Sequence, residues 1–222
     1  MSAFGHLVFD LDGTLVDTKD DLAAAVNVAL RELRLPEQEP RVLWGYVGRG
    51  ARVLIERALG RHGDDTYMVE SALATFMLWY GDHLLDRSAV YPGLGEVIAT
   101  LAGEGVVFSL LTNKPADMSR AIVDGLGLGA TFPRLVGGDT LPVRKPDPAG
   151  LVRLIDAAGV APGRTLMVGD SPIDVATGRN AGVATCGVLW GFSGPAIRDC
   201  GADVLVARPE ELLPVVRTGV RR

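Results

Sequence analysis

Residues 6–17 read HLVFDLDGTLVD, an apolar run that ends in two acids and a glycine. Asp10 and Asp12 lie where a buried strand should end, although burying acids without partners is unfavourable. In an extended chain their side chains point the same way, so both can address one ligand. A divalent cation or a cationic side chain can keep one acid ionised while the other carries a proton. The pair can therefore supply a nucleophile and a general acid.

The second half of the chain alternates short apolar runs with helical stretches. The apolar runs lie at 106–111, 135–136, 165–168, 184–188 and 203–206, and the helical patterns lie near 94–102, 116–126, 148–158 and 173–181. This alternation is typical of parallel strands joined by crossover helices. The continuous apolar run at 7–10 fits the same sheet. We predict an α/β fold whose core is a Rossmann-like, doubly wound parallel sheet.

Residues 16–88 have a helical rhythm instead. Apolar residues recur there at three- and four-residue steps, as in Leu22, Val26, Ala29 and Leu33, and in Val69, Leu73, Phe76, Tyr80 and Leu84. No strand is predicted within this segment, and Asp17 or Thr18 is expected to cap its first helix. We predict a small helical cap domain of the four-helix type at 16–88, inserted into a catalytic core domain formed by 1–15 and 89–222.

Polar residues follow several of the predicted strands. In an open α/β sheet, ligands bind outside the carboxyl ends of the strands. The residues at those ends are Asp10 and Asp12, then Thr112, Asn113 and Lys114, then Lys145, and finally Gly169, Asp170 and Asp174. We therefore expect these side chains to converge at one edge of the sheet.

The acids among them form a set of oxygen ligands without His or Cys. Such a set favours Mg²⁺ over Zn²⁺, and magnesium in turn points to a phosphate substrate. Asp170 would add a ligand to the pair at 10 and 12. Asp174 could orient Asp170 or a metal-bound water, or it could be an acid favoured at a helix N-terminus by the dipole.

Two further residues fit a phosphate site. Lys145 lies in RKPDP, where two prolines restrict it, and its ammonium could hold Asp10 ionised and balance a phosphoryl oxygen. Thr112 offers a hydroxyl at a strand end. Each has a plain alternative, a surface lysine and a helix-capping threonine, and it is their combination that favours the functional interpretation.

Composition limits the class of partner. The chain has 222 residues, 48% of them hydrophobic, and a net charge of −5, which argues against a broad nucleic-acid or anionic-membrane surface. No signal-peptide pattern or membrane-length apolar stretch is found, so a cytoplasmic location is expected.

Cys186 and Cys200 are expected to be reduced structural thiols, with a disulfide as the alternative. Monomer and homodimer both remain open.

Four segments, in order and spacing, resemble the motifs of haloacid dehalogenase-like phosphatases. They are DLDGT (10–14), LLTNK with Thr112, RKPDP with Lys145, and VGDSPID with Asp170 and Asp174.

The resemblance implies that Asp10 attacks phosphorus to form an aspartyl-phosphate. Asp12 would protonate the leaving alcohol and then activate water. Mg²⁺ would be held by the carboxylates of Asp10 and Asp170 and the backbone carbonyl of Asp12. Thr112 and Lys145 would steady the phosphoryl group. By the same resemblance, Gly13, Thr14 and Asn113 would also contact substrate, and Ser171 and Asp174 would support the metal ligands.

The cap segment YVGRGARVLIERALG (46–60) is similar to the corresponding stretch of phosphoglycolate phosphatases. By this resemblance Arg49 would face the active site, where its guanidinium could receive a substrate carboxylate. The alternative is a solvated helix charge. Gly48 and Gly50 could act as hinge or close-approach positions.

We expect a phosphatase for a small phosphate monoester, 2-phosphoglycolate before others. A nucleotide monophosphate, a sugar or amino-sugar phosphate, or pyrophosphate would be an alternative substrate, and a β-phosphoglucomutase-like mutase an alternative reaction. Because Asp12 is retained, the chain does not resemble the dehalogenase or phosphonate-cleaving branches. A receiver-like signalling module or a non-catalytic binding protein is the alternative of a different class.

Overall fold

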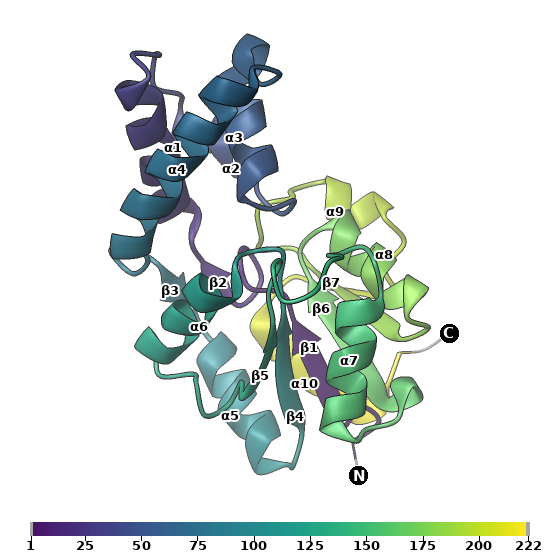
Figure 1. Cartoon of the computed structure of the whole chain (residues 1–222). Coiled ribbons are helices and arrows are strands. Elements are labelled where there is room, and N and C mark those ends of the chain that lie inside the picture. The colour runs from purple at the N-terminus through teal and green to yellow at the C-terminus, as the bar shows by residue number, and fades with distance from the viewer. Residues whose placement is uncertain (1, 221–222) are drawn as a thin grey trace.

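The core of the protein is a parallel six-stranded sheet. The computed structural model describes residues 2–220. Its strands lie in the order β5-β4-β1-β6-β7-β8 (Figure 1). Their bounds are β1 (His6–Phe9), β4 (Val107–Leu111), β5 (Arg134–Val136), β6 (Thr165–Gly169), β7 (Ala184–Val188) and β8 (Val204–Val206). β1 is central, pairing His6 with Val107 on one side and with Thr165 on the other.

Helices cover both faces of this sheet, as the alternation of strands and helices predicts. They are α5 (Leu94–Gly103), α6 (Ala116–Gly125), α7 (Ala149–Ala158), α8 (Pro172–Asn180), α9 (Ala196–Asp199) and α10 (Leu212–Thr218), with short turns η2 (Pro162–Arg164) and η3 (Pro209–Glu211). Successive side chains of β1 enter different apolar clusters, Leu7 and Phe9 one and Val8 the other. The doubly wound α/β core is confirmed.

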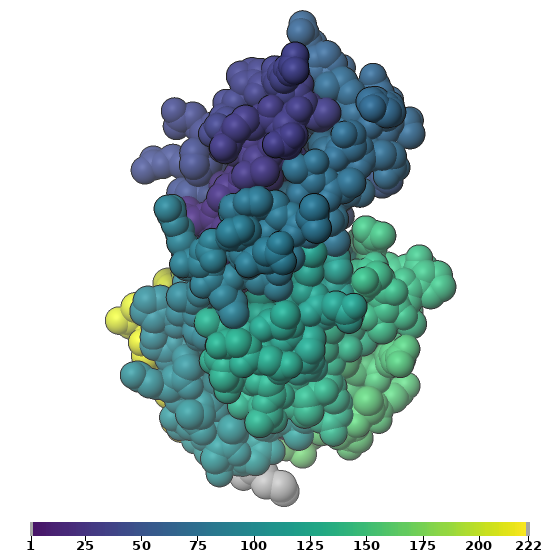
Figure 2. Space-filling view, turned by 60° about the vertical axis from the view of Figure 1, so that its left-hand side comes forward, coloured from purple at the N-terminus to yellow at the C-terminus, as the bar shows by residue number. Residues whose placement is uncertain are grey.

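The inserted cap consists of α1 (Lys19–Glu32), α2 (Pro40–Trp44), α3 (Ala51–Leu59), η1 (Gly60–His62) and α4 (Thr66–Asp82). It forms a separate lobe above the core (Figure 2). The lobe has an apolar interior because the periodic residues of its helices, among them Leu22, Val26 and Phe76, are buried. The cap lies over one edge of the sheet (Figure 1).

Two short strands connect the lobes. β2 (Val16–Asp17) and β3 (Ala89–Val90) pair in antiparallel fashion. The expectation of a strand-free segment from residue 16 is therefore wrong at Val16 and Asp17. Val16 pairs with Val90, which is distant in sequence. The domain boundaries predicted from the sequence fall at this pair.

The first cap helix begins as expected, but its capping residue does something else. Thr18 is the N-cap of α1, yet its side chain makes no capping hydrogen bond. Its hydroxyl donates instead to Asp12 Oδ1 at 2.7 Å. One of the two residues predicted to cap the first helix of the cap domain thus contacts one of the two motif acids.

Two smaller expectations can be compared with the structure. Cys186 is buried, Cys200 is partly exposed, and both are free thiols. Within residues 2–220, the helices are too short or too polar to cross a bilayer.

Candidate active site

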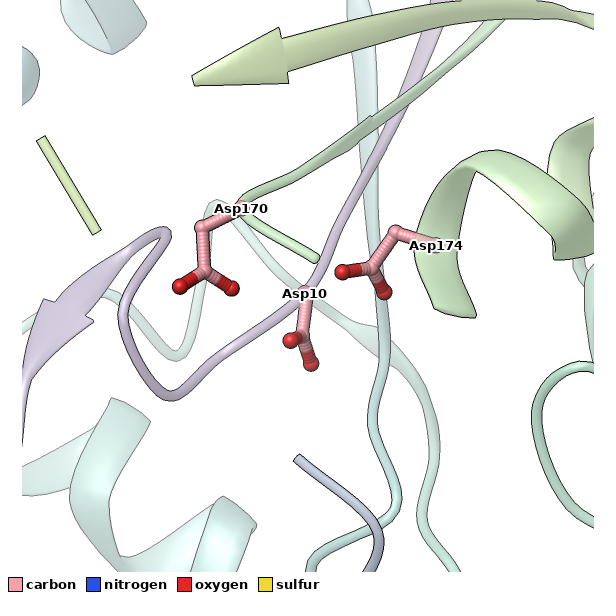
Figure 3. Close-up of side chains that lie close together, drawn as sticks. All are labelled: Asp10, Asp170 and Asp174. Atoms are coloured by element: carbon pink, nitrogen blue, oxygen red, sulfur yellow. The ribbon is translucent and has the colours of Figure 1, made fainter. Parts of the chain in front are cut away.

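Three buried carboxylates meet at the carboxyl edge of the central strands. Asp10 follows β1, Asp170 follows β6, and Asp174 lies in the first turn of α8. Each offers an oxygen within 4.8 Å of the others. Asp170 and Asp174 flank Asp10 (Figure 3). Because β1 and β6 are neighbours in a parallel sheet, residues far apart in sequence converge here, as predicted.

Lys145, in the loop between β5 and α7, neutralises part of this charge. Its Nζ lies 2.8 Å from Asp10 Oδ1 and 2.6 Å from Asp174 Oδ1. Burial alone would lower the pKa of Lys145, but these two carboxylates hold it above its usual value. The lysine is therefore charged, and it leaves an excess of negative charge among the three acids.

Burial, together with this excess of negative charge, raises the pKa values of two of the acids. Burial, opposed by the charge of Lys145, raises the pKa of Asp10 to about 7. Burial and the neighbouring carboxylates of Asp174 and Asp10 raise the pKa of Asp170 to about 8, despite two backbone amide donors. A bound divalent cation would favour the ionised form of both acids and so oppose these shifts, and the donor set fits a metal that prefers oxygen ligands.

The surrounding hydrogen bonds separate metal ligand from support. Asp174 already accepts from Lys145 on one oxygen and from the backbone N–H and hydroxyl of Ser171 on the other. Asp170 Oδ2 accepts from the amide N–H groups of Phe192 at 2.6 Å and Ser193 at 3.3 Å. Asp10 and Asp170 are thus better placed to hold a cation, and Asp174 to orient Lys145.

Two glycines let the loops approach this closely. Gly13 has a φ of +83°, and a Cβ there would lie 2.6 Å from Asp170 Oδ2. A Cβ at Gly191 would collide with the side chain of Asp170. Only glycine satisfies both positions. The loop after β7, which carries Gly191, Phe192 and Ser193, is a contributor that sequence reasoning missed; its signal is the pair of glycines in GFSG.

Asp12 has a different environment from Asp10. Its Oδ1 accepts from the Thr18 hydroxyl and, at 2.9 Å, from Lys114 Nζ. Its side chain is 12% exposed, and it lines the space beneath the cap. The two motif acids therefore lie in separate hydrogen-bond networks, one around Lys145 and one around Lys114.

Lys114 and Tyr80 are functional candidates to which the sequence analysis gave no role. Lys114 Nζ lies 2.7 Å from the hydroxyl oxygen of Tyr80, which belongs to α4 in the cap. Burial alone would lower the pKa of Lys114, but Asp12 and Tyr80 raise it; burial raises the pKa of Tyr80 to about 12. The signal for Lys114 was its place after β4 beside Thr112, whereas Tyr80 looked like an ordinary apolar position of its helix.

A cavity of about 40 Å³ lies between cap and core. Its polar lining is Asp10, Asp12, Tyr80, Thr112, Asn113 and Lys114. Asn113 also joins the lobes, because its Nδ2 donates to the carbonyl of Gly48 at 3.1 Å and to that of Lys145 at 3.2 Å. The space is small and polar at its base, which suits a small charged ligand.

Two predicted substrate residues, Arg49 and Thr14, lie outside both the cavity lining and the acidic cluster. Arg49 is exposed and is not among the residues that line the cavity. Thr14 is fully buried, and its hydroxyl oxygen has no hydrogen-bond partner within residues 2–220. The neighbouring Gly50 has a φ of +92° and does line the cavity, so the glycines of VGRG approach the site while its arginine points outward.

Comparisons with known proteins agree with this architecture. The model of the haloacid dehalogenase-like hydrolase family matches residues 7–188. A phosphoglycolate phosphatase of Pseudomonas putida is 43% identical over 191 residues, covering 84% of this chain and 70% of that protein. A phosphoglycolate phosphatase of Rhodospirillum rubrum is 40% identical over 203 residues, covering 88% and 84%.

A solved structure is similar over nearly the whole chain. The crystal structure of a predicted phosphoglycolate phosphatase from Haemophilus somnus superposes with a TM-score of 0.91 at 30% identity, covering 97% of this chain and 99% of that one. With the motif acids gathered at the carboxyl edge of a doubly wound sheet under a helical cap, the chain belongs to the haloacid dehalogenase-like hydrolase family.

Proposed function

We propose that this protein is a Mg²⁺-dependent phosphatase that hydrolyses 2-phosphoglycolate through an aspartyl-phosphate on Asp10. The single observation that carries the proposal is the arrangement of Asp10, buried beside Lys145 yet lining the cavity under the cap. The relatives named phosphoglycolate phosphatase support the substrate.

The reaction has two displacements at phosphorus. In the first, a carboxylate oxygen of Asp10 forms a bond to phosphorus while the bond to the ester oxygen breaks, and Asp12 donates a proton to that oxygen. In the second, Asp12 accepts a proton from a water that attacks phosphorus, and the bond to Asp10 breaks. Glycolate and phosphate leave, and both acids return to their starting state.

The remaining residues hold and neutralise the phosphoryl group. Lys145 keeps one oxygen of Asp10 engaged, which leaves the other for attack. Thr112 and Asn113 line the cavity beside Asp10. The Thr112 hydroxyl can donate to a phosphoryl oxygen, whereas the side-chain N–H bonds of Asn113 already donate to the Gly48 and Lys145 carbonyls, so Asn113 would contribute its backbone N–H. Gly13 brings its loop against Asp170, which positions the backbone that follows Asp12.

Mg²⁺ is the cation we propose for the acidic cluster. The carboxylates of Asp10 and Asp170 and the backbone carbonyl of Asp12 would hold it, and Asp174 and Ser171 would support them. When bound, the cation supplies positive charge that offsets the charge of the phosphoryl oxygens. The substrate contacts expected of Arg49 and Thr14 stay predictions from the sequence. The same holds for the cytoplasmic location and for the monomeric or homodimeric state.

The proposal is tested by measuring phosphate release with Mg²⁺ from a panel of substrates: 2-phosphoglycolate, a nucleoside monophosphate, glucose 6-phosphate, an amino-sugar phosphate and pyrophosphate. We expect the highest kcat/KM for 2-phosphoglycolate. Asp10→Asn should lower kcat by about 10³-fold or more for every substrate. Asp156→Asn, the same change at an exposed position of α7, is the matched control and should leave kcat unaltered.

Three results would contradict parts of the proposal. Turnover that survives Asp10→Asn would exclude Asp10 as nucleophile. A higher kcat/KM for another member of the panel would replace the substrate. Isomerisation of a glucose phosphate without phosphate release would replace the hydrolase with a mutase.

A further inference from the structure

The cavity under the cap has an uneven distribution of charge. Its cap-side wall is apolar and includes Leu22, Val47, Leu54 and Phe76. Among all the residues that line it, Lys114 is the one with a cationic side chain. An anionic group on the organic part of a ligand therefore has one site of opposite charge within the cavity.

Lys114 retains a hydrogen-bond donor for such a group. Its ammonium has three N–H bonds; one points to Asp12 Oδ1 at 2.9 Å and one to the Tyr80 hydroxyl oxygen at 2.7 Å. Within residues 2–220 the third has no partner of its own. The side chain is only 4% exposed, so this donor is withdrawn from bulk water. A buried, partly engaged ammonium favours a further anionic partner.

The reach of a small substrate agrees with this position. When the phosphoryl group lies on Asp10, the leaving ester oxygen must lie within hydrogen-bond distance of Asp12, which protonates it. In a phosphorylated α-hydroxy acid the carboxyl carbon is two covalent bonds from that oxygen. Lys114 Nζ lies 2.9 Å from Asp12 Oδ1. A carboxylate two covalent bonds from the ester oxygen would therefore lie beside Lys114 Nζ.

We propose that Lys114 and the hydroxyl of Tyr80 bind the substrate's carboxylate; this inference rests on the proposed phosphatase function. The two groups would thereby determine the selectivity for phosphate esters that carry an anionic group near the ester oxygen. Lys114 comes from the core and Tyr80 from α4, so this subsite is complete only when the cap lies on the core. Arg49, exposed and outside the cavity lining, is not its cation.

The test compares two phosphate esters that differ at one group. The first is 2-phosphoglycolate, and its match is 2-hydroxyethyl phosphate, which has a neutral hydroxymethyl group in place of the carboxylate. The measured quantity is the ratio of their kcat/KM values, in which effects of a variant on Asp12 and on phosphoryl transfer cancel. Lys114→Met should lower this ratio by about 10- to 150-fold, the value of a hydrogen bond to a charged group. Tyr80→Phe should lower it by a smaller factor in the same direction.

A binding measurement covers the case in which Lys114→Met is inactive. The unreactive analogue 3-phosphonopropionate and its match propylphosphonate, which has a methyl group in place of the carboxylate, are titrated into wild type, Lys114→Met and Tyr80→Phe. The preference for 3-phosphonopropionate should fall in both variants. Tyr80→Phe keeps the aromatic ring and is expected to fold. Arg41→Met, an exposed change in α2, is the matched control and should keep the wild-type preference.

The outcomes separate this inference from the proposed function. An unchanged ratio in Lys114→Met and Tyr80→Phe, with wild type selective for 2-phosphoglycolate, overturns the inference alone. Collapse of the ratio in Arg49→Met instead assigns the carboxylate to the cap arginine and also overturns it. Wild-type selectivity for a different carboxylated ester, lost in Lys114→Met, supports the inference while replacing the substrate. A wild-type enzyme that prefers neither 2-phosphoglycolate nor 3-phosphonopropionate over its match without a carboxylate overturns both.

Discussion

The two ends of β1 bury polar side chains of opposite character. At the amino end, His6 is fully buried, and its Nε2 lies 2.8 Å from the Ser109 hydroxyl, with Thr165 on its other side. At the carboxyl end, Asp10 shares Lys145 with Asp174. The first cluster is neutral and satisfies itself, whereas the second is charged and carries more acid than base.

The two ends therefore respond to pH in opposite directions. Burial, and then the charge of Arg134, lowers the pKa of His6 to about 4. Below the ordinary pKa of histidine, about 6.5, His6 binds a proton in the unfolded chain but not in the folded state. Stability therefore falls as the pH drops toward 4. The raised pKa values of Asp10 and Asp170 mean that the folded state keeps protons that the unfolded chain has released. There, stability falls as pH rises from about 4 toward 8. The amino end stabilises the fold, whereas the carboxyl end is the one at which we propose that a cation binds.

Removing the cation of the carboxyl end should have the largest effect. Lys145→Met leaves Asp10 and Asp174 buried without their shared partner, so we expect a loss of about 3–5 kcal/mol in the free energy of unfolding. We also expect kcat to fall by about 10²-fold or more, because a fixed positive charge beside the phosphoryl group is lost. Urea unfolding and phosphate release measure the two effects.

The matched control is Lys19→Met. Lys19 also pairs with an acid, Asp17 at 2.7 Å, but its side chain is 32% exposed. Such a pair contributes about 1 kcal/mol or less. Equal, small losses in both variants would mean that the carboxyl end is not the charged, water-poor site described.

A divalent cation should abolish the pH response of the carboxyl end. Binding requires ionised carboxylates, so Mg²⁺ should raise the melting temperature more at pH 8 than at pH 5. At a hundred times its dissociation constant, the stabilisation is about 2.7 kcal/mol. Thermal unfolding with Mg²⁺ and with a chelator, at both pH values, measures this difference.

The control for this measurement is Asp170→Asn. It removes one acid whose pKa is raised and one metal ligand we propose, so the response to Mg²⁺ at pH 8 should largely disappear. A cation effect of the same size at both pH values would show that the cation binds elsewhere.

The sequence predicted the charged end far better than it predicted the space above it. Asp10, Lys145 and Asp170 could be placed together because parallel strands end at one edge, and this follows from the order of strands alone. Their position required no knowledge of how the cap sits. The pair β2 and β3 was missed because two-residue strands leave no periodic signal.

Contacts between cap and core were beyond the reach of periodicity. Tyr80 follows the helical pattern of its buried neighbours, and nothing in that pattern shows that its hydroxyl meets Lys114. Thr18 has the residue type of a helix cap and lies at the capping position, but its hydroxyl serves Asp12. Arg49 was given a role by motif, and its exposed side chain reflects a loop geometry that spacing alone does not encode.

The smallest expected effect lies at the amino end and tests whether the two ends are independent. Ser109→Ala leaves His6 Nε2 buried without its partner, which should cost about 1–3 kcal/mol in urea unfolding. Because this site is at the other end of β1 from the acids, kcat/KM should not change. Thr100→Ala, which removes an exposed hydroxyl that donates to the backbone carbonyl of Glu96, should alter stability by about 0.5 kcal/mol or less. A fall in kcat/KM in Ser109→Ala would mean that packing along β1 couples the neutral cluster to Asp10, and the division between a stabilising end and a catalytic end would fail.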